Sequence, residues 1–219
     1  TYTQNAAAQS ALDFPGVVSA AVSISDATLT SGDSPLVFIN LQAPLTLKNV
    51  AATATTVGSG LRLIAVTAAA TSIDVTGGSF TAPASRSVAF VAGITGGALD
   101  VAGATFSAVG HVFLVDGGTG TVGTVITFRD HKCVAGWSCI TFLTAFTGAT
   151  LNVLGGSLMP DVTGGDGIYF PVAMPAITGT ILIRGVAVGS LPNCRYGLLI
   201  PYLNGVTLTI EDSTLVSYD

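Results

Sequence analysis

Charged side chains are scarce in this 219-residue chain. Lys, Arg, Asp and Glu together make up 9% of it, whereas apolar residues make up 49%. An ordinary soluble domain carries about 25% charged residues, most of them on its surface. The surface must therefore consist mainly of Thr, Ser, Ala, Gly and backbone, and we expect much of it to be buried against other subunits or coated.

Long apolar runs and basic clusters are also missing. No segment supplies the ~18 consecutive apolar residues of a membrane-spanning helix, so no transmembrane segment is expected. The net charge is −5 and the seven basic residues are scattered, which argues against nucleic acid as a partner. The chain starts at Thr1 without a signal-like segment. We interpret it as a mature or excised segment of an extracellular or cell-surface protein.

Cysteine and histidine are too few for a disulfide framework or a zinc site. The short loop between Cys133 and Cys139 lets their Cα atoms reach the ~5.5–6 Å of a disulfide, so these two are predicted to pair and Cys194 to stay free. The alternative is that Cys133 points into a core and stays reduced. His111 and His131 lie at no metal-ligand spacing, so no metal or other cofactor is expected. No Asn-x-Ser/Thr sequon occurs, so any glycan is expected to be O-linked to Thr or Ser.

A repeat is present throughout the chain. Its unit reads apolar, any, apolar, any, then usually Gly, Asp or Asn, two further residues and an apolar residue, with starts about 25 residues apart. The eight instances are VSISDATL (22–29), LTLKNVAA (45–52), IDVTGGSF (73–80), LDVAGATF (99–106), ITFRDHKC (126–133), LNVLGGSL (151–158), ILIRGVAV (181–188) and LTIEDSTL (208–215). Alternation points Ile73 and Val75 inward and Asp74 outward. Gly77 or Asp130 at the fifth position suits a sharp bend with positive φ.

A second, shorter apolar pattern alternates with the first. Its instances are LVFI (36–39), LRLI (61–64), VAFV (88–91), VFLV (112–115), ITFL (140–143), IYFP (168–171) and LLIP (198–201). Each repeat thus holds two or three short strands that bury their inward residues only by stacking on neighbouring repeats. We predict an all-β fold, a single-stranded parallel β-helix solenoid of about eight coils over residues 17–219, with an N-terminal arm or cap at 1–16. A leucine-rich solenoid would show helical spacing, and a β-sandwich would not keep one register through eight units.

The second pattern has an outward column that is largely apolar in its later members. The column comprises Val37, Arg62, Ala89, Phe113, Thr141, Tyr169 and Leu199. Exposed apolar area of this kind often marks a partner interface. The candidate interface residues are Phe113, Tyr169, Leu199, Pro201, Tyr202 and Tyr2. The alternative is that a loop or the N-terminal arm covers this column.

The units ITFRDHKC (126–133), LTIEDSTL (208–215) and LTLKNVAA (45–52) resemble the coils of right-handed parallel β-helix proteins of the pectin-lyase-like superfamily. Among these, the Ala-, Gly-, Thr- and Val-rich coils and Cys133 at an inward corner are most similar to surface proteins of the kinetoplastid dispersed gene family. The resemblance covers residues 17–219. It implies a secreted or surface location and no defined catalysis.

Candidate catalytic groups are few. The run RDHK at 129–132 is the only dense polar cluster, and because Asp130 takes the bend position we interpret the run as a surface corner. Asp74 and Asp100 share an outward column in adjacent coils and should lie ~5 Å apart as a solvated acidic pair. No catalytic, cofactor-binding or metal-binding residue is therefore assigned.

These features favour a structural protein over an enzyme. The repeat continues through LTIEDSTL (208–215), so the final coil is expected to leave an open apolar core that templates association. We expect copies to assemble head to tail into a fibre or layer, with residues 1–16 reaching across the junction. One alternative is a fragment of a longer solenoid. Another is a carbohydrate-binding or carbohydrate-cleaving β-helix protein, a polysaccharide lyase or hydrolase, which a charged, aromatic-lined groove would favour.

Overall fold

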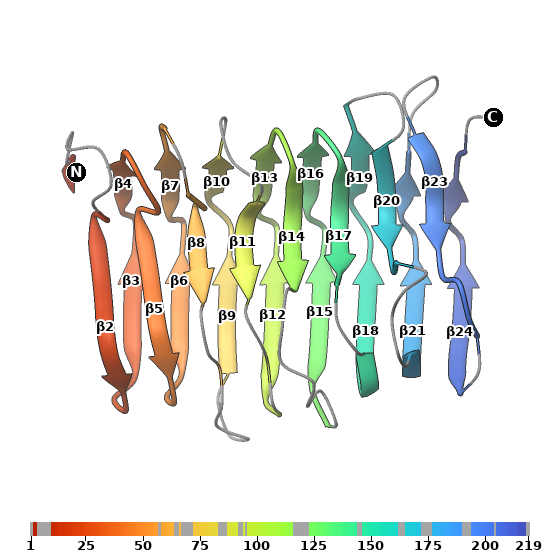
Figure 1. Ribbon diagram of the computed structural model, residues 1–219, viewed down its shortest axis with the longest axis horizontal. Coiled ribbons are helices and arrows are strands. Elements are labelled where there is room, and N and C mark those ends of the chain that lie inside the picture. Colours follow the sequence, from red (N-terminus) through yellow and green to blue (C-terminus); the bar gives the residue numbers. More distant parts are fainter. Residues whose placement is uncertain are drawn as a thin grey trace.

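In a computed structural model, the chain winds into a solenoid whose successive coils form three parallel sheets (Figure 1). The structure describes residues 2–3, 10–56, 58–63, 66, 72–82, 87–91, 94, 96–115, 123–143, 146–161, 165–171, 177–189, 194–203 and 205–217. Within these residues there is no helix, so none that could cross a membrane, and the paired strands are parallel. The all-β parallel solenoid that the repeat predicts is confirmed.

Within the described residues, the three sheets have nine, eight and eight strands, and each turn of the solenoid contributes one strand to each sheet. Sheet A has nine strands, in the order β1 (Tyr2–Thr3), β4 (Thr28–Ser31), β7 (Ala51–Ala54), β10 (Ser79–Ala82), β13 (Thr105–Ala108), β16 (Lys132–Ala135), β19 (Ser157–Pro160), β22 (Ala187–Val188) and β25 (Thr214–Leu215). Sheet B has eight strands, in the order β2 (Leu12–Val18), β5 (Leu36–Leu41), β8 (Leu61–Leu63), β11 (Ser87–Val91), β14 (His111–Val115), β17 (Ser138–Phe142), β20 (Gly165–Tyr169) and β23 (Cys194–Leu199). Sheet C has eight strands, which are β3 (Val22–Ser25), β6 (Leu45–Lys48), β9 (Ser72–Thr76), β12 (Ala98–Ala102), β15 (Val125–Arg129), β18 (Phe146–Leu154), β21 (Ile177–Arg184) and β24 (Val206–Glu211).

The first apolar pattern forms the strands of sheet C. The positions predicted to point inward, 73, 75, 99, 101, 151 and 153, are each at most 2% exposed and lie in two columns of the strand register. The alternating positions 74, 100 and 152 are partly exposed. Burying one such apolar side chain contributes about 1.5–3 kcal/mol, and each is covered only when both neighbouring coils are present.

The fifth position of the pattern turns the chain out of sheet C and towards sheet A. All eight residues there have a positive φ, as the sequence predicts: Asp26 51°, Asn49 52°, Gly77 63°, Gly103 63°, Asp130 47°, Gly155 68°, Gly185 65° and Asp212 47°. Gly adopts this conformation freely, and Asn and Asp do so more easily than other L-residues. The Asn49 side-chain amide also donates to the Asp26 carboxylate at 3.0 Å, which ties two neighbouring corners together.

Two pairings of sheet B, β8 with β11 and β14 with β17, differ by one residue from the alignment expected from the sequence, and the other pairings of the expected column agree with it. Phe113 pairs with Ile140, and Leu114 pairs with Thr141, so Leu114 occupies the outward column in which Phe113 was expected. Phe113 is 3% exposed, and its ring packs edge-on against Phe128 with 5.0 Å between centroids. The expected exposure of Phe113 at an interface is therefore wrong, because its ring belongs to the core.

The N-terminal segment joins the solenoid earlier than expected. β2 begins at Leu12, inside the predicted arm, and Phe14 stacks on Phe38 of β5 at 4.6 Å. β1 pairs with β4 of the same chain, so the residues it contains add to the edge of sheet A rather than reaching across a junction. Residues 1 and 4–9 lie outside the described residues, as does the side chain of Tyr2, an expected interface residue.

Candidate functional sites

Polar and aromatic side chains from consecutive coils gather where the chain enters sheet B. His111, Ser138, Asp166 and Tyr196 occupy equivalent positions in the register of β14, β17, β20 and β23. The carbonyl of Trp137 accepts a 2.6 Å hydrogen bond from the backbone amide of Asp166. We call the resulting group the aromatic strip; it comprises His111, Trp137, Asp166, Arg195 and Tyr196.

A buried carboxylate fixes one guanidinium in the aromatic strip. Asp166 is 3% exposed and accepts two bonds from Arg195, from Nε to Oδ1 at 3.1 Å and from Nη2 to Oδ2 at 2.8 Å. These bonds raise the pKa of Arg195 above its ordinary value, so the guanidinium stays charged. The bonds use two of the five N–H donors of a guanidinium, while the Arg195 side chain remains about half exposed.

The rings of the aromatic strip are held by neighbours yet open to solvent. Trp137 is 61% exposed and Tyr196 is 42% exposed. The guanidinium carbon of Arg195 lies 5.2 Å from the centroid of the Tyr196 ring, within cation–π range. The His111 ring meets Trp137 edge-on at 5.7 Å, and its Nδ1 lies 3.0 Å from the hydroxyl of Thr141.

A disulfide anchors the loop that carries Trp137. Cys133 at β16 and Cys139 at β17 are joined, with their Cα atoms 5.9 Å apart, which is the pairing that the spacing predicts. Both cysteines are buried, whereas Trp137 between them projects into solvent. Cys194 is a free, buried cysteine, and burial raises the pKa of its thiol.

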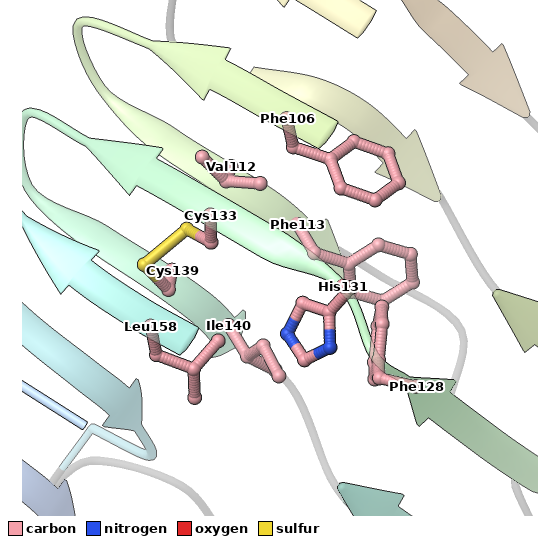
Figure 2. A pocket seen from close by; sticks show the side chains of 9 residues that line it. All are labelled: Phe106, Val112, Phe113, Phe128, His131, Cys133, Cys139, Ile140 and Leu158. Atoms are coloured by element: carbon pink, nitrogen blue, oxygen red, sulfur yellow. A yellow bond between two sulfur atoms is a disulfide. The ribbon is translucent and has the colours of Figure 1, made fainter. Parts of the chain in front are cut away.

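His131 lies in the core, although the sequence placed it in a surface corner. It is 3% exposed, and Figure 2 shows its ring among Phe113, Phe128 and Ile140. Neither ring nitrogen has a hydrogen-bond partner among the residues that the structure describes. Burial lowers the pKa of His131 to about 4, outweighing the opposite effect of the nearby Asp130 carboxylate. The imidazole is therefore neutral at pH 7.

The space beside His131 is a small apolar cavity within the core. It is lined by Phe106, Val112, Phe113, Phe128, His131, Cys133, Cys139, Ile140 and Leu158 (Figure 2). The cavity leaves about 10 Å³ for the centre of a water molecule. A buried water needs two to four polar partners, and among these side chains only His131 provides hydrogen-bonding nitrogens. The cavity thus suits neither a substrate nor a bound water.

The acidic pair expected on the outside of sheet C is present. Asp74 and Asp100 are in register on β9 and β12. Arg129 on β15 bonds to the carboxylate of Asp100, and Asp130 forms the corner that follows. The described ranges contain no group of three or more His, Cys, Asp or Glu that could hold a metal ion. The arrangement is an ion pair on the surface with a second carboxylate beside it.

Two inward columns are more exposed at β24 and β25 than they are one coil earlier. Ile183 is 0% exposed, but Ile210, the next member of its column, is 42% exposed. Val188 is likewise 0% exposed, and its neighbour Leu215 is 37% exposed. At the opposite end of the solenoid, Val22 and Ile24 of β3 and Phe14 of β2 are only partly buried.

Several expected interface residues lie on or beside the coil of β23, β24 and β25. Tyr169, Leu199 and Pro201 are partly exposed, and Tyr202 is 55% exposed. Tyr169 and Leu199 are paired in the register of β20 and β23, so they share one outward column as expected. Their role at an interface remains a prediction.

Comparison of the chain with models of known protein families, with curated proteins and with solved structures finds no match. The assignment of the fold as a parallel solenoid therefore rests on the strand pairing alone.

Proposed function

We propose that this solenoid is a structural protein of an extracellular or cell-surface fibre or layer, in which copies stack end to end. The observation that carries the proposal is the exposure of Ile210 and Leu215, the β24 and β25 members of two inward columns. The resemblance of the repeat to pectin-lyase-like β-helix proteins and to kinetoplastid dispersed-gene-family surface proteins supports the location. We propose no catalytic role.

The register of sheet C supports stacking of identical copies. Ile24 and Ile210 are the first and last members of one inward column, which is continuous through the paired strands. A second copy placed one strand spacing away, about 4.8 Å, would continue this column with Ile24 covering Ile210. Each apolar side chain so covered gains up to about 1.5–3 kcal/mol, scaled by the area that it still exposes.

Backbone groups at the two ends are equally complementary. In the described part of the chain, β23, β24 and β25 form one edge of the three sheets, and β2, β3 and β1 form the other. Parallel strand addition would satisfy the donors and acceptors of both edges. A contact between opposite ends is heterologous and does not close, so its repetition generates a filament.

The test uses single charges at the two ends. Ile210→Asp and Ile24→Asp should each fold but lose concentration-dependent growth in sedimentation velocity and filaments in electron micrographs. A mixture of the two variants should form heterodimers and nothing larger, because each variant retains one unaltered end. Val125→Asp is the matched control, since Val125 is 38% exposed but lies on β15, far from either end.

Two results would overturn the proposal. One is a wild-type protein that stays monomeric at every concentration reached. The other is an Ile210→Asp variant that grows like the wild type. Growth of Ile210→Asp together with loss of growth in Val125→Asp would place the contact on the side of the solenoid instead.

A further inference from the structure

We propose that the aromatic strip is a binding site for a neutral oligosaccharide, a function that goes beyond end-to-end stacking. The strip runs along the side of the solenoid from β14 to β23, and β23 is also the edge strand of its sheet that a stacked copy would adjoin. Binding is therefore tested where stacking is blocked. The proposal rests on three features of the described residues: exposed rings, a fixed guanidinium and the length of the strip.

The exposed rings are the first feature. Trp137 and Tyr196 are both exposed aromatic side chains, at 61% and 42%. Both are nevertheless held in place: Trp137 lies in a loop closed by the Cys133–Cys139 disulfide, and the Tyr196 ring lies under Arg195. Flat rings that are rigid and solvent-exposed offer apolar faces at a low entropic cost. The apolar C–H face of a pyranose ring can pack flat against an aromatic ring of this kind.

The guanidinium of Arg195 is the second feature. Its bidentate contact with Asp166 neutralises its charge locally and locks its plane. The N–H donors of Arg195 that Asp166 does not use are therefore fixed in direction. They can donate hydrogen bonds to the hydroxyl oxygens of a sugar. Because Asp166 balances the guanidinium charge, the pair offers no net positive charge to an added carboxylate or phosphate. The site therefore favours an uncharged polyol.

The length of the strip is the third feature. Trp137 is hydrogen-bonded to Asp166 in the next coil, and Asp166 is paired with Tyr196 in the coil after that. Two coil steps separate the two rings along the axis, which is about 10 Å. This separation exceeds a single sugar ring, so the ligand is an oligosaccharide or a stretch of polysaccharide lying along the solenoid axis.

The experiment is affinity electrophoresis of the full chain in native gels containing a β-glucan, a xylan, a mannan or polygalacturonate. We expect at least one neutral polymer to retard the wild type. Trp137→Ala and Tyr196→Ala should each raise the dissociation constant at least tenfold. Arg195→Lys keeps the charge but loses the fork of donors, and should raise it several-fold. Ile39→Ala is the control, because Ile39 is 36% exposed on β5 of the same sheet, remote from the strip.

The outcomes separate this proposal from the stacking proposal. Glycan binding is measured in the Ile210→Asp background, so the result does not depend on whether copies stack. Circular dichroism shows that each variant is folded. The proposal is contradicted if no neutral polymer retards the protein, or if Trp137→Ala binds the polymer with unchanged affinity. Retardation by polygalacturonate alone also contradicts it, because the strip would then recognise an acidic polymer.

Discussion

His131 is an uncharged imidazole enclosed by apolar side chains, and this makes the stability of the solenoid depend on pH. In the unfolded chain its pKa should be about 6.5, whereas in the folded protein it is lowered to about 4. The free energy of unfolding should be unaffected above pH 6.5 and should fall as pH drops from about 6.5 to 4, because the unfolded chain binds the proton first. The loss at pH 4 should be about 3 kcal/mol.

Urea unfolding at pH 7 and pH 4 measures this effect. The total pH dependence of stability includes every ionisable group, so the informative quantity is the difference in unfolding free energy between the wild type and His131→Val. Valine is a natural choice because Val50 and Val186 occupy the same corner position in other coils and are 1% exposed. Parallel pH profiles for the wild type and His131→Val would contradict the assignment.

The disulfide between Cys133 and Cys139 should stabilise the loop that carries Trp137. The closed loop is short, so the chain-entropy contribution is about 2 kcal/mol. Replacing both cysteines by alanine should lower the free energy of unfolding by at least this amount, measured in urea. Adding reductant should shift the transition of the wild type and not that of the double variant. A non-reduced peptide map that links Cys194 to either partner would show a different pairing.

The corner after each strand of sheet C is a structural element with its own sequence requirement. Asp130 has φ of 47°, a conformation that costs ordinary L-residues roughly 1–2 kcal/mol. Asp130→Asn and Asp130→Gly should therefore change stability by less than about 0.5 kcal/mol, and Asp130→Val should cost about 1–2 kcal/mol. Thermal unfolding of the three variants tests this ranking. A large effect of Asp130→Asn on any binding or enzymatic property would instead show that the carboxylate has a role beyond the bend.

The two kinds of strand differ in how far their sequence determines their register. In sheet C, polar residues alternate with apolar ones and a corner residue follows, so only one alignment buries the apolar side chains. In β14, the residues from Val112 to Val115 are all apolar and all buried. Alternation of polar and apolar residues therefore does not define an inward face in β14. For this reason the sequence alone wrongly predicted that Phe113 points outward.

The candidate sites were harder to predict than the strands. The burial of His131 could have been predicted from the sequence, because the same corner position holds the apolar residues Val50, Ala104 and Val186 in other coils. The aromatic strip could not have been predicted from the sequence, because Trp137 lies in a turn before its strand and β20 pairs with β23 through a register shift. Only the strand pairing brings Trp137, Asp166 and Arg195 together, across loops of different length.

At the scale of the whole molecule, the described strands of each coil pair only with strands of the adjacent coils, so a complete coil should be removable. Deleting residues 78–103 joins Gly77 to Ala104 and removes β10, β11 and β12, one strand from each sheet. The shortened chain should keep a β-sheet circular dichroism spectrum and a cooperative unfolding transition, because the inward columns continue in register. Deleting residues 78–90 removes about half a coil and should abolish folding. Equal behaviour of the two deletions would contradict a coil-by-coil architecture.

The direction of the backbone hydrogen bonds has a mechanical consequence. Bonds between parallel strands are slanted but connect each strand to the next one across the sheet, and the strands run across the long dimension of the molecule (Figure 1). A tensile force along that dimension therefore pulls on the bonds of one coil boundary at a time, instead of shearing a whole sheet. The molecule should extend in successive steps, each releasing the contour length of one coil, while the remaining coils stay folded and reclose when the tension falls.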